Sequence, residues 1–141
     1  MKKNIFPWLY LGLGFAQAAH SVEEVLTGLW LRMADISGAI HNRFSPFPHV
    51  VWSTAGFAAA NIIIVALLIG LSPLVFLKLP WAWKLAWVVA VVETLNGIGH
   101  VTAALISRAY FPGCVTGIVL FGLGISLWAI PSIRRIPSGA D

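Results

Sequence analysis

The sequence predicts an all-α membrane protein, a bundle of four transmembrane helices in a single domain that covers residues 1–141. The chain is 59% hydrophobic and only 10% charged, whereas charged residues make up about a quarter of a typical soluble domain. Its apolar residues also gather in four stretches, and each approaches or exceeds the roughly 20 residues that cross a hydrocarbon core as a helix. We therefore predict helices over approximately 5–31, 50–77, 81–107 and 113–131.

The first apolar stretch, 5–31, follows Lys2 and Lys3 and has two interpretations. A short basic segment, an apolar run and the small residues of Ala16-Gln17-Ala18 resemble a secretory signal peptide with its cleavage site. The apolar run does not stop there, however, because 25–31 continues it. We expect one uncleaved helix from residue 5 to residue 31.

The connection from Arg32 to His49 is the longest in the chain and contains one glycine and two prolines. Its length admits a short interfacial helix over 33–40, and it also admits a lid over the outer mouth of the bundle. We favour a plain connector over a lid. We assign no role to its histidines, His41 and His49.

The other two boundaries are short and are marked by helix breakers. The segment Lys78-Leu-Pro80 separates the second stretch from the third, so these helices should be antiparallel neighbours. Pro112-Gly113 separates the third stretch from the fourth, and we expect this dipeptide to set the turn geometry alone. Arg108 and Tyr110 lie just before that turn, where we expect them to anchor the interface.

The distribution of basic residues predicts the orientation of the bundle. With both termini in the cytoplasm, the basic residues on the cytoplasmic side are Lys2, Lys3, Lys78, Lys84, Arg134 and Arg135. The opposite side then holds only Arg32, Arg43 and Arg108. This excess favours a cytoplasmic N-terminus and C-terminus. The net charge of +4 is thus a feature of membrane topology and gives no argument for nucleic acid as a partner.

Three of the five acidic residues lie inside the apolar stretches, together with histidine and asparagine. The first stretch supplies His20, Glu23 and Glu24, and the third supplies Glu93, Asn96 and His100. Within each set the spacing places the side chains on one helix face. Because ionisable groups are costly inside a membrane, both faces should point into the bundle.

The two polar sets are also expected at the same depth. At about 1.5 Å per residue, the first set lies roughly 22–28 Å from the inner end of its helix, and the second lies roughly 18–28 Å from its own. A purely structural role is the simplest alternative. Interhelical polar bonds contribute only about 0.6 kcal/mol, whereas burying one acidic side chain costs about 2.5–3.5 kcal/mol. We therefore predict one functional site in the outer half of the bilayer.

The segment His20-Ser-Val-Glu23-Glu24 resembles the motif of the HXXEE family of small bacterial membrane proteins. The later residues Glu93, Asn96 and His100, followed by Tyr110-Phe-Pro-Gly-Cys-Val-Thr116, also look like that family, which typically has a Tyr-x-Pro-Gly-x-x-Thr segment there. The resemblance implies that these residues matter and that the protein lies in the bacterial inner (plasma) membrane. It implies no reaction, because the family has no established activity.

The first functional hypothesis is a membrane-embedded enzyme that transfers protons on a lipophilic substrate, as an isomerase, cyclase or hydrolase would. A buried histidine beside a carboxylate can give and take protons near neutral pH. In this hypothesis His20 shuttles the proton and Glu24 or Glu23 is its partner. Glu93 is the second carboxylate, and His100 and Asn96 orient or polarise the substrate.

A second hypothesis is a metal-dependent membrane enzyme, in which His20, Glu23, Glu24, Glu93 and His100 hold iron, manganese or zinc. Histidine and carboxylate ligands suit these metals, and inward-facing helices carry such ligands in carboxylate bundles. The weakness is the seven-residue spacing of Glu93 and His100, about 10.5 Å along the helix axis. That spacing places acid/base chemistry slightly ahead.

A third hypothesis is a proton-coupled carrier or accessory subunit, because chains of Glu and His serve as proton relays in transporters. Four helices are few for a carrier, so this hypothesis requires a homo-oligomer. In every case the lipid bilayer is the expected surrounding. The sequence does not identify a substrate or an oligomeric state.

Overall fold

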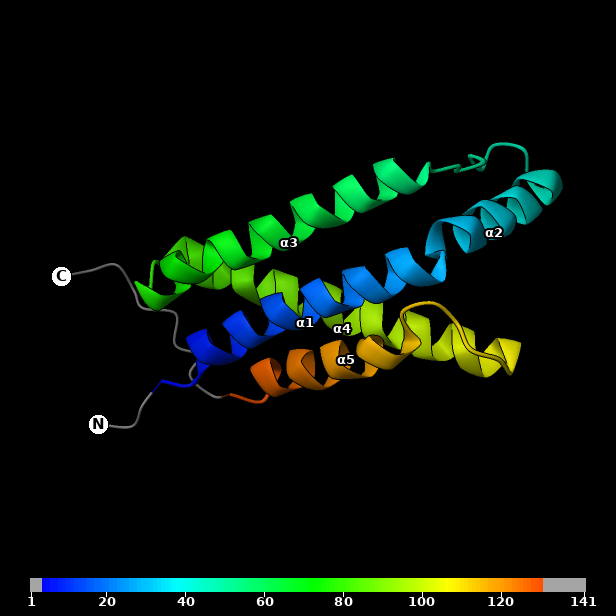
Figure 1. The fold of residues 1–141 in the computed structure, drawn as a ribbon. Coiled ribbons are helices and arrows are strands. Elements are labelled where there is room, and N and C mark those ends of the chain that lie inside the picture. The colour runs from blue at the N-terminus through cyan, green and yellow to red at the C-terminus, as the bar shows by residue number, and fades with distance from the viewer. Residues whose placement is uncertain (1–3, 131–141) are drawn as a thin grey trace.

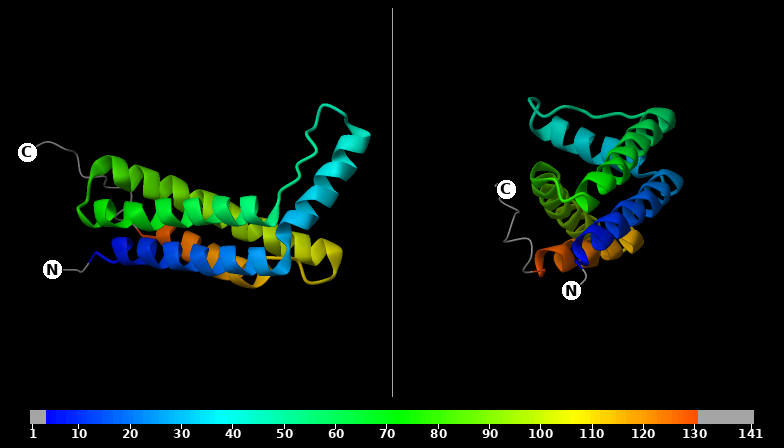
Figure 2. Two further views of the ribbon diagram at one scale, coloured as in Figure 1. Left: turned by 45° about the horizontal axis from the view of Figure 1, so that its top comes forward. Right: turned by 90° about the vertical axis from the view of Figure 1, so that its left-hand side faces the viewer.

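The structure is a computed structural model that describes residues 4–130 of the chain. These residues form five helices and no strand. The helices are α1 (Phe6–Thr27), α2 (Leu29–Arg43), α3 (Thr54–Phe76), α4 (Pro80–Ser107) and α5 (Cys114–Trp128). Four of them run along one bundle axis, and α2 leans away from it at one end (Figures 1 and 2). The predicted end of the last helix at residue 131 and the basic residues Lys2, Lys3, Arg134 and Arg135 lie outside the described residues.

Two helices, α3 and α4, are long and apolar enough to cross a membrane. The helix α5 is also apolar but has only 15 residues. The first residues of α1 and the last residues of α5 lie at the same end of the bundle (Figure 1). The turn at Lys78–Leu79 makes α3 and α4 antiparallel, and the two helices diverge away from it (Figure 1).

The prediction of one uninterrupted helix over 5–31 is wrong, because the helix is interrupted at Gly28. Gly28 has φ of 76°, and its backbone N–H donates to the carbonyl oxygen of Glu24. This left-handed conformation ends a helix, and glycine adopts it without a steric penalty. The apolar run continues past Gly28, so hydropathy alone gave no sign of the break.

In the connection expected over 32–49, α2 occupies residues 32–43, about the first two thirds. It is longer than the short interfacial helix that the sequence allowed over 33–40. Ser37 fastens the returning segment to α2: the backbone N–H of Val50 donates to Ser37 Oγ at 3.0 Å, and that hydroxyl lies 3.2 Å from the carbonyl oxygen of Val50. The break at Gly28 thus turns a predicted spanning segment into two helices with different directions.

The apolar core lies toward the start of α1. Phe6 and Trp83 pack there with ring centroids 4.5 Å apart, and the indole N–H of Trp83 donates to the carbonyl oxygen of Val75 at 2.9 Å. The other buried members of this core are Tyr10, Leu13, Leu71, Ala82, Ala86, Ala90, Leu120 and Leu127. This packing fixes α1 against α4 and α5, and so sets the register at the opposite, polar end of the same helices.

We expect Gly28→Ala to destabilise the protein by about 1–2 kcal/mol, because a left-handed conformation costs an L-residue that much. A Cβ at Gly28 would meet no atom closer than 3.6 Å, so the penalty comes from the backbone alone. Thermal unfolding in detergent, followed by circular dichroism, measures the change. Gly12→Ala is the control: it lies in the same helix with open space around it and should leave stability equal or raised. Equal melting of the wild type and Gly28→Ala would contradict the assignment of a strained break.

Candidate functional site

A cluster of three buried side chains joins α1 to α4. The Nε2 atom of His20 lies 3.1 Å from Glu24 Oε1, and the Nε2 atom of His100 lies 3.1 Å from the same oxygen. The two imidazole rings meet edge to face with centroids 4.6 Å apart. His20 is fully buried, and Glu24 and His100 are 6% and 7% exposed. Two histidines therefore converge on one carboxylate oxygen.

The other ring nitrogen of His100 is fixed by the backbone. Its Nδ1 atom lies 2.6 Å from the carbonyl oxygen of Pro112. A carbonyl oxygen can only accept a hydrogen bond, so Nδ1 carries a proton and donates it. In a neutral ring the Nε2 atom then has a lone pair. This lone pair faces Glu24.

The Nδ1 atom of His20 is fixed by a relay of two side chains. It lies 2.8 Å from Thr116 Oγ1, and that hydroxyl donates a short hydrogen bond to Glu23 Oε2. A threonine hydroxyl has one proton, so Thr116 must accept from His20. The Nε2 atom of a neutral His20 therefore also has a lone pair. It is buried and close to Glu24 Oε1, yet no hydrogen bond of acceptable geometry reaches it from any described residue.

The convergence of these atoms has an electrostatic consequence. Two lone pairs and one carboxylate oxygen repel one another in a site that excludes water. The arrangement is stable only with a positive charge among them, which is either a proton or a metal ion. A proton can bridge the carboxylate to one Nε2 atom with good geometry, whereas a metal ion satisfies both at once.

Glu23 lies next to Glu24 in the sequence but contacts a different part of the molecule. Its carboxylate accepts from the backbone N–H groups of Val115 and Thr116, at 3.3 and 2.9 Å, at the start of α5. Carboxylates are favourable at helix N-termini because the first N–H groups have no partner within the helix. The hydroxyl of Tyr110 also donates to Glu23 at 2.6 Å. Desolvation and, after it, this hydrogen bond raise the pKa of Tyr110 above its ordinary value.

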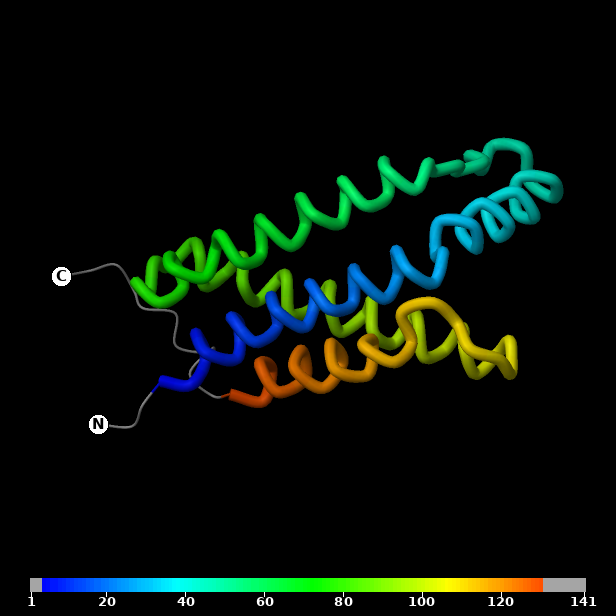
Figure 3. The backbone as a smooth tube through the Cα atoms, viewed as in Figure 1, coloured from blue at the N-terminus to red at the C-terminus, as the bar shows by residue number. Residues whose placement is uncertain are grey.

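The turn before α5 brings the backbone unusually close to both histidines. Figure 3 shows this segment turning back from the end of α4 toward the start of α5. Gly113 has φ of 83°, and a Cβ there would lie 2.7 Å from His100 Nδ1 and 2.8 Å from His20 Cε1. Only glycine meets both requirements. The expectation that Pro112-Gly113 sets the turn alone is wrong, because Pro112 binds His100 and Gly113 makes room for the cluster.

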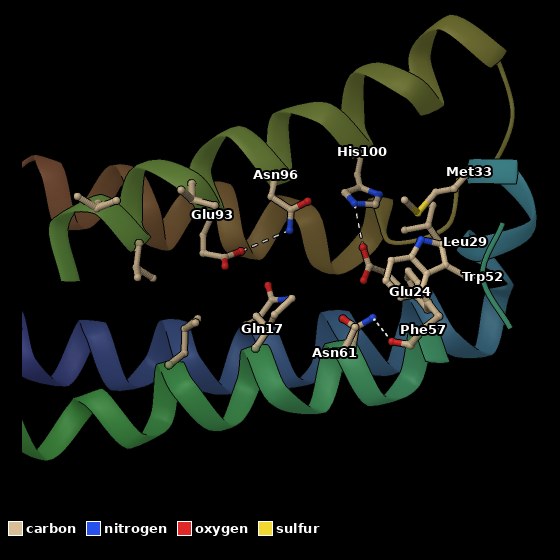
Figure 4. Close-up of a pocket in the computed structure, with 16 residues that line it drawn as sticks. Gln17, Glu24, Leu29, Met33, Trp52, Phe57, Asn61, Glu93, Asn96 and His100 are labelled. Carbon is tan, nitrogen blue, oxygen red and sulfur yellow. Dashed lines mark hydrogen bonds and ion pairs between the residues drawn. The ribbon is translucent and has the colours of Figure 1, made fainter. Parts of the chain in front are cut away.

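A cleft of about 660 Å³ adjoins the cluster and lies between α1, α3 and α4 (Figure 4). Glu24 and His100 belong to both the cluster and the cleft lining. Four further polar side chains line the cleft: Gln17, Asn61, Glu93 and Asn96. The remaining lining is apolar and includes Leu29 and Met33 of α2. A site of this volume, with apolar walls and a few polar groups, is typical of small-molecule sites.

The structure divides the six predicted site residues into three groups. His20, Glu24 and His100 form the cluster, and each offers one ligand atom within 4.8 Å of the others. Glu93 and Asn96 lie in the cleft and contact each other at 3.4 Å. Glu23, on α1, accepts hydrogen bonds from Val115 and Thr116 at the start of α5. Of the five predicted metal ligands, Glu23 and Glu93 therefore lie outside the set that converges.

The segment between α4 and α5 contributes more to the site than the sequence analysis expected. Tyr110, expected to be an interface anchor, hydrogen-bonds Glu23, and Thr116 fixes the proton of His20. The Tyr-x-Pro-Gly-x-x-Thr pattern was the available signal for this role. The outer histidines His41 and His49 stack on each other with ring centroids 6.5 Å apart, near the C-terminal end of α2.

Over residues 4–130, fold and site together define an all-helical protein with two histidines and two carboxylates buried between its helices beside a cleft. The chain matches the family model described as a protein of unknown function with HXXEE motif over residues 11–129, and it belongs to this HXXEE family. The matched span contains the whole cluster and the turn before α5. Neither a curated protein nor a solved structure matches the chain significantly.

We expect Thr116→Val to destabilise the protein by about 1–3 kcal/mol, because it leaves the Nδ1–H group of the buried His20 without a partner. Thr116→Ser keeps the hydroxyl and is the matched control. Chemical unfolding in mixed micelles, followed by tryptophan fluorescence, compares the two variants. If valine and serine are tolerated equally, the relay from Glu23 through Thr116 to His20 does not hold the ring.

Proposed function

We propose that this protein is a membrane-embedded enzyme that holds one iron, manganese or zinc ion at His20, Glu24 and His100 and acts on a lipophilic substrate in the adjoining cleft. The observation that carries the proposal is the convergence of two Nε2 lone pairs on one carboxylate oxygen, with both Nδ1 protons already committed. A single divalent ion satisfies all three atoms.

The distances support a metal centre. Bonds from zinc to histidine nitrogen or carboxylate oxygen are about 2.0–2.2 Å, so neighbouring ligand atoms lie about 2.8–3.1 Å apart in octahedral geometry and about 3.3–3.6 Å apart in tetrahedral geometry. Both nitrogen-to-oxygen distances in the cluster are 3.1 Å. Small inward movements of the three side chains would therefore complete the coordination.

The outer contacts of the histidines also suit a metal centre. Metal-binding histidines almost always donate their other N–H group to a carbonyl, carboxylate or water, which fixes the ring and raises its basicity. Pro112 provides this contact for His100, and Thr116 with Glu23 provides it for His20. Two histidines and one carboxylate leave coordination positions open, as catalytic zinc sites and facial-triad iron sites do. A metal ion there polarises a substrate oxygen or activates a bound water.

The proposed location is the plasma membrane, with α1, α3, α4 and α5 as the four spans and both termini in the cytoplasm. The distribution of side chains supports this location, because buried positions hold the ionisable groups while large apolar side chains cover the outside. Exposed examples on the four helices are Val22, Leu26, Ile62, Leu67, Val92, Leu95, Leu105, Ile118 and Val119. The basic residues near the expected cytoplasmic ends support the orientation.

Proton transfer without a metal is the second candidate, and one observation favours it. Glu93 gives the cleft a second carboxylate, separate from the cluster. A proton shared between Glu24 and one histidine, with Glu93 across the substrate, forms an acid/base pair of the kind that isomerases need.

Metal content distinguishes the two candidates. We expect the purified protein, reconstituted separately with Fe²⁺, Mn²⁺ and Zn²⁺ and then desalted, to retain about one ion per chain for at least one metal. His20→Ala and His100→Ala should lose it, and His49→Ala, which removes an exposed histidine, should retain it. Elemental analysis of the folded fractions gives the answer. Wild-type protein without any of the three ions above background would leave proton transfer as the function.

The two carboxylates of the site should also behave differently. Glu24→Gln removes a ligand, and we expect metal affinity to fall by more than about a hundredfold, since even outer contacts of ligands contribute about 10–100-fold. Glu93→Gln should change metal affinity by less than about threefold, because Glu93 lies outside the converging set. Competition with a chelator of known affinity measures both. Equal losses in the two variants would place Glu93 in the metal centre.

A further inference from the structure

The amide groups that line the cleft are oriented by their neighbours. Asn61 Nδ2 donates to the carbonyl oxygen of Phe57 at 3.2 Å, which can only accept. Asn96 Nδ2 points to the Glu93 carboxylate at 3.4 Å. Gln17 Nε2 donates to Ser21 Oγ at 3.2 Å. In each case the amide nitrogen donates one of its two N–H groups, and no hydrogen bond to the amide oxygen is found among the described residues.

The cleft therefore offers hydrogen-bond acceptors. Gln17 is 3% exposed, and its Oε1 atom has no partner among the described residues. Figure 4 shows Gln17 pointing from α1 across the cleft toward Glu93 and Asn96 of α4. A buried polar atom without a partner is costly, so an orphaned acceptor beside a cleft points to a ligand that donates.

Glu93 adds a negative charge to these acceptors. Its side chain is 5% exposed, and Asn96 supplies its one hydrogen bond among the described residues. The ion pairs found in the described part of the chain both involve Glu24, so no lysine, arginine or histidine there forms an ion pair with Glu93. A buried carboxylate without an ion pair either takes up a proton or binds a cation, and a cationic ligand in the cleft can provide that partner.

We propose that the cleft binds an amphiphile with a protonated amino group, which pairs with Glu93 and donates to the amide oxygen of Gln17. Its apolar chain lies against the cleft walls formed by Ile64, Leu68, Val89 and Val92. This proposal names the substrate class for the proposed function and rests on it. The three donors of an ammonium group match the acceptors present, whereas an anionic head group would lie against the Glu93 carboxylate.

The geometry also restricts the reactive part of the amphiphile. Glu93 and His100 are seven residues apart on α4, which is about 10.5 Å along the helix axis. Glu24 and His100 border both the cleft and the cluster. The group that reacts at the cluster therefore lies about two helical turns from the nitrogen atom of the same molecule.

Binding of n-dodecylamine and 1-dodecanol to the full chain in lipid nanodiscs tests the proposal. The probes share their tail and differ in the head group, and empty nanodiscs correct for partitioning. We expect wild-type protein to bind the amine at least about tenfold more tightly than the alcohol, as hydrogen bonds to a charged group imply. Glu93→Gln should reduce this preference to within about twofold. Asp35→Asn removes the same charge from an exposed position of α2 and should keep the preference.

Equal binding of the two probes by wild-type protein would overturn the proposal, as would an amine preference that persists in folded Glu93→Gln. Gln17→Leu is a second variant that leaves the charge in place and should weaken amine binding by about three- to tenfold. Metal content, measured on the same samples, separates the two proposals. Bound metal without amine preference overturns the amine site alone, and amine preference in protein without metal supports the amine site while overturning the metal centre.

Discussion

Two imidazole lone pairs and a carboxylate oxygen share a space from which water is excluded, and the rest of the molecule is arranged around this repulsion. In water each of these atoms would be solvated independently. Within the bundle, His20, Glu24 and His100 are nearly inaccessible, so the repulsion is not screened. The fold holds them together through contacts made elsewhere, by the apolar packing of Phe6 and Trp83 at the far end and by the turn before α5 at the near end. These contacts therefore hold together three atoms that repel one another unless a proton or a metal ion lies among them.

The two motifs of the chain act as one unit. The first motif supplies His20, Glu23 and Glu24. The second motif, Tyr110 to Thr116, supplies the groups that hydrogen-bond to Glu23 and His20 and, through Pro112, to His100. Glu23 binds the N-terminus of α5 and Tyr110, and through Thr116 it orients His20. Pro112 orients His100, and Gly113 keeps the space between the rings free of side-chain atoms. The adjacent glutamates thus have different roles, one at the cluster and the other in the support that positions it.

The sequence predicted much of this arrangement and missed specific parts for physical reasons. Hydropathy located the apolar segments, and helical spacing with depth brought His20 and His100 to one level. Spacing did not distinguish Glu23 from Glu24, because successive residues differ by only about 100° around a helix and both fall on a broad polar face. Which neighbouring helix each one meets is a property of the packing. The part played by Pro112 was hidden because a backbone carbonyl leaves no mark in residue type, and the break at Gly28 was hidden by the apolar residues that follow it.

The change of direction at Gly28 affects how molecules reach the cleft. It places Leu29 and Met33 of α2, with Trp52 from the returning segment, at the end of the cleft beyond Glu24 and His100 (Figure 4). These apolar side chains cover that end of the cleft, while α3 and α4 diverge beside it. The membrane enzyme that we propose would take its substrate from the surrounding lipid. Its rate would then follow the mole fraction of substrate within the bilayer, and diluting the same substrate with inert lipid would slow turnover even at an unchanged bulk concentration.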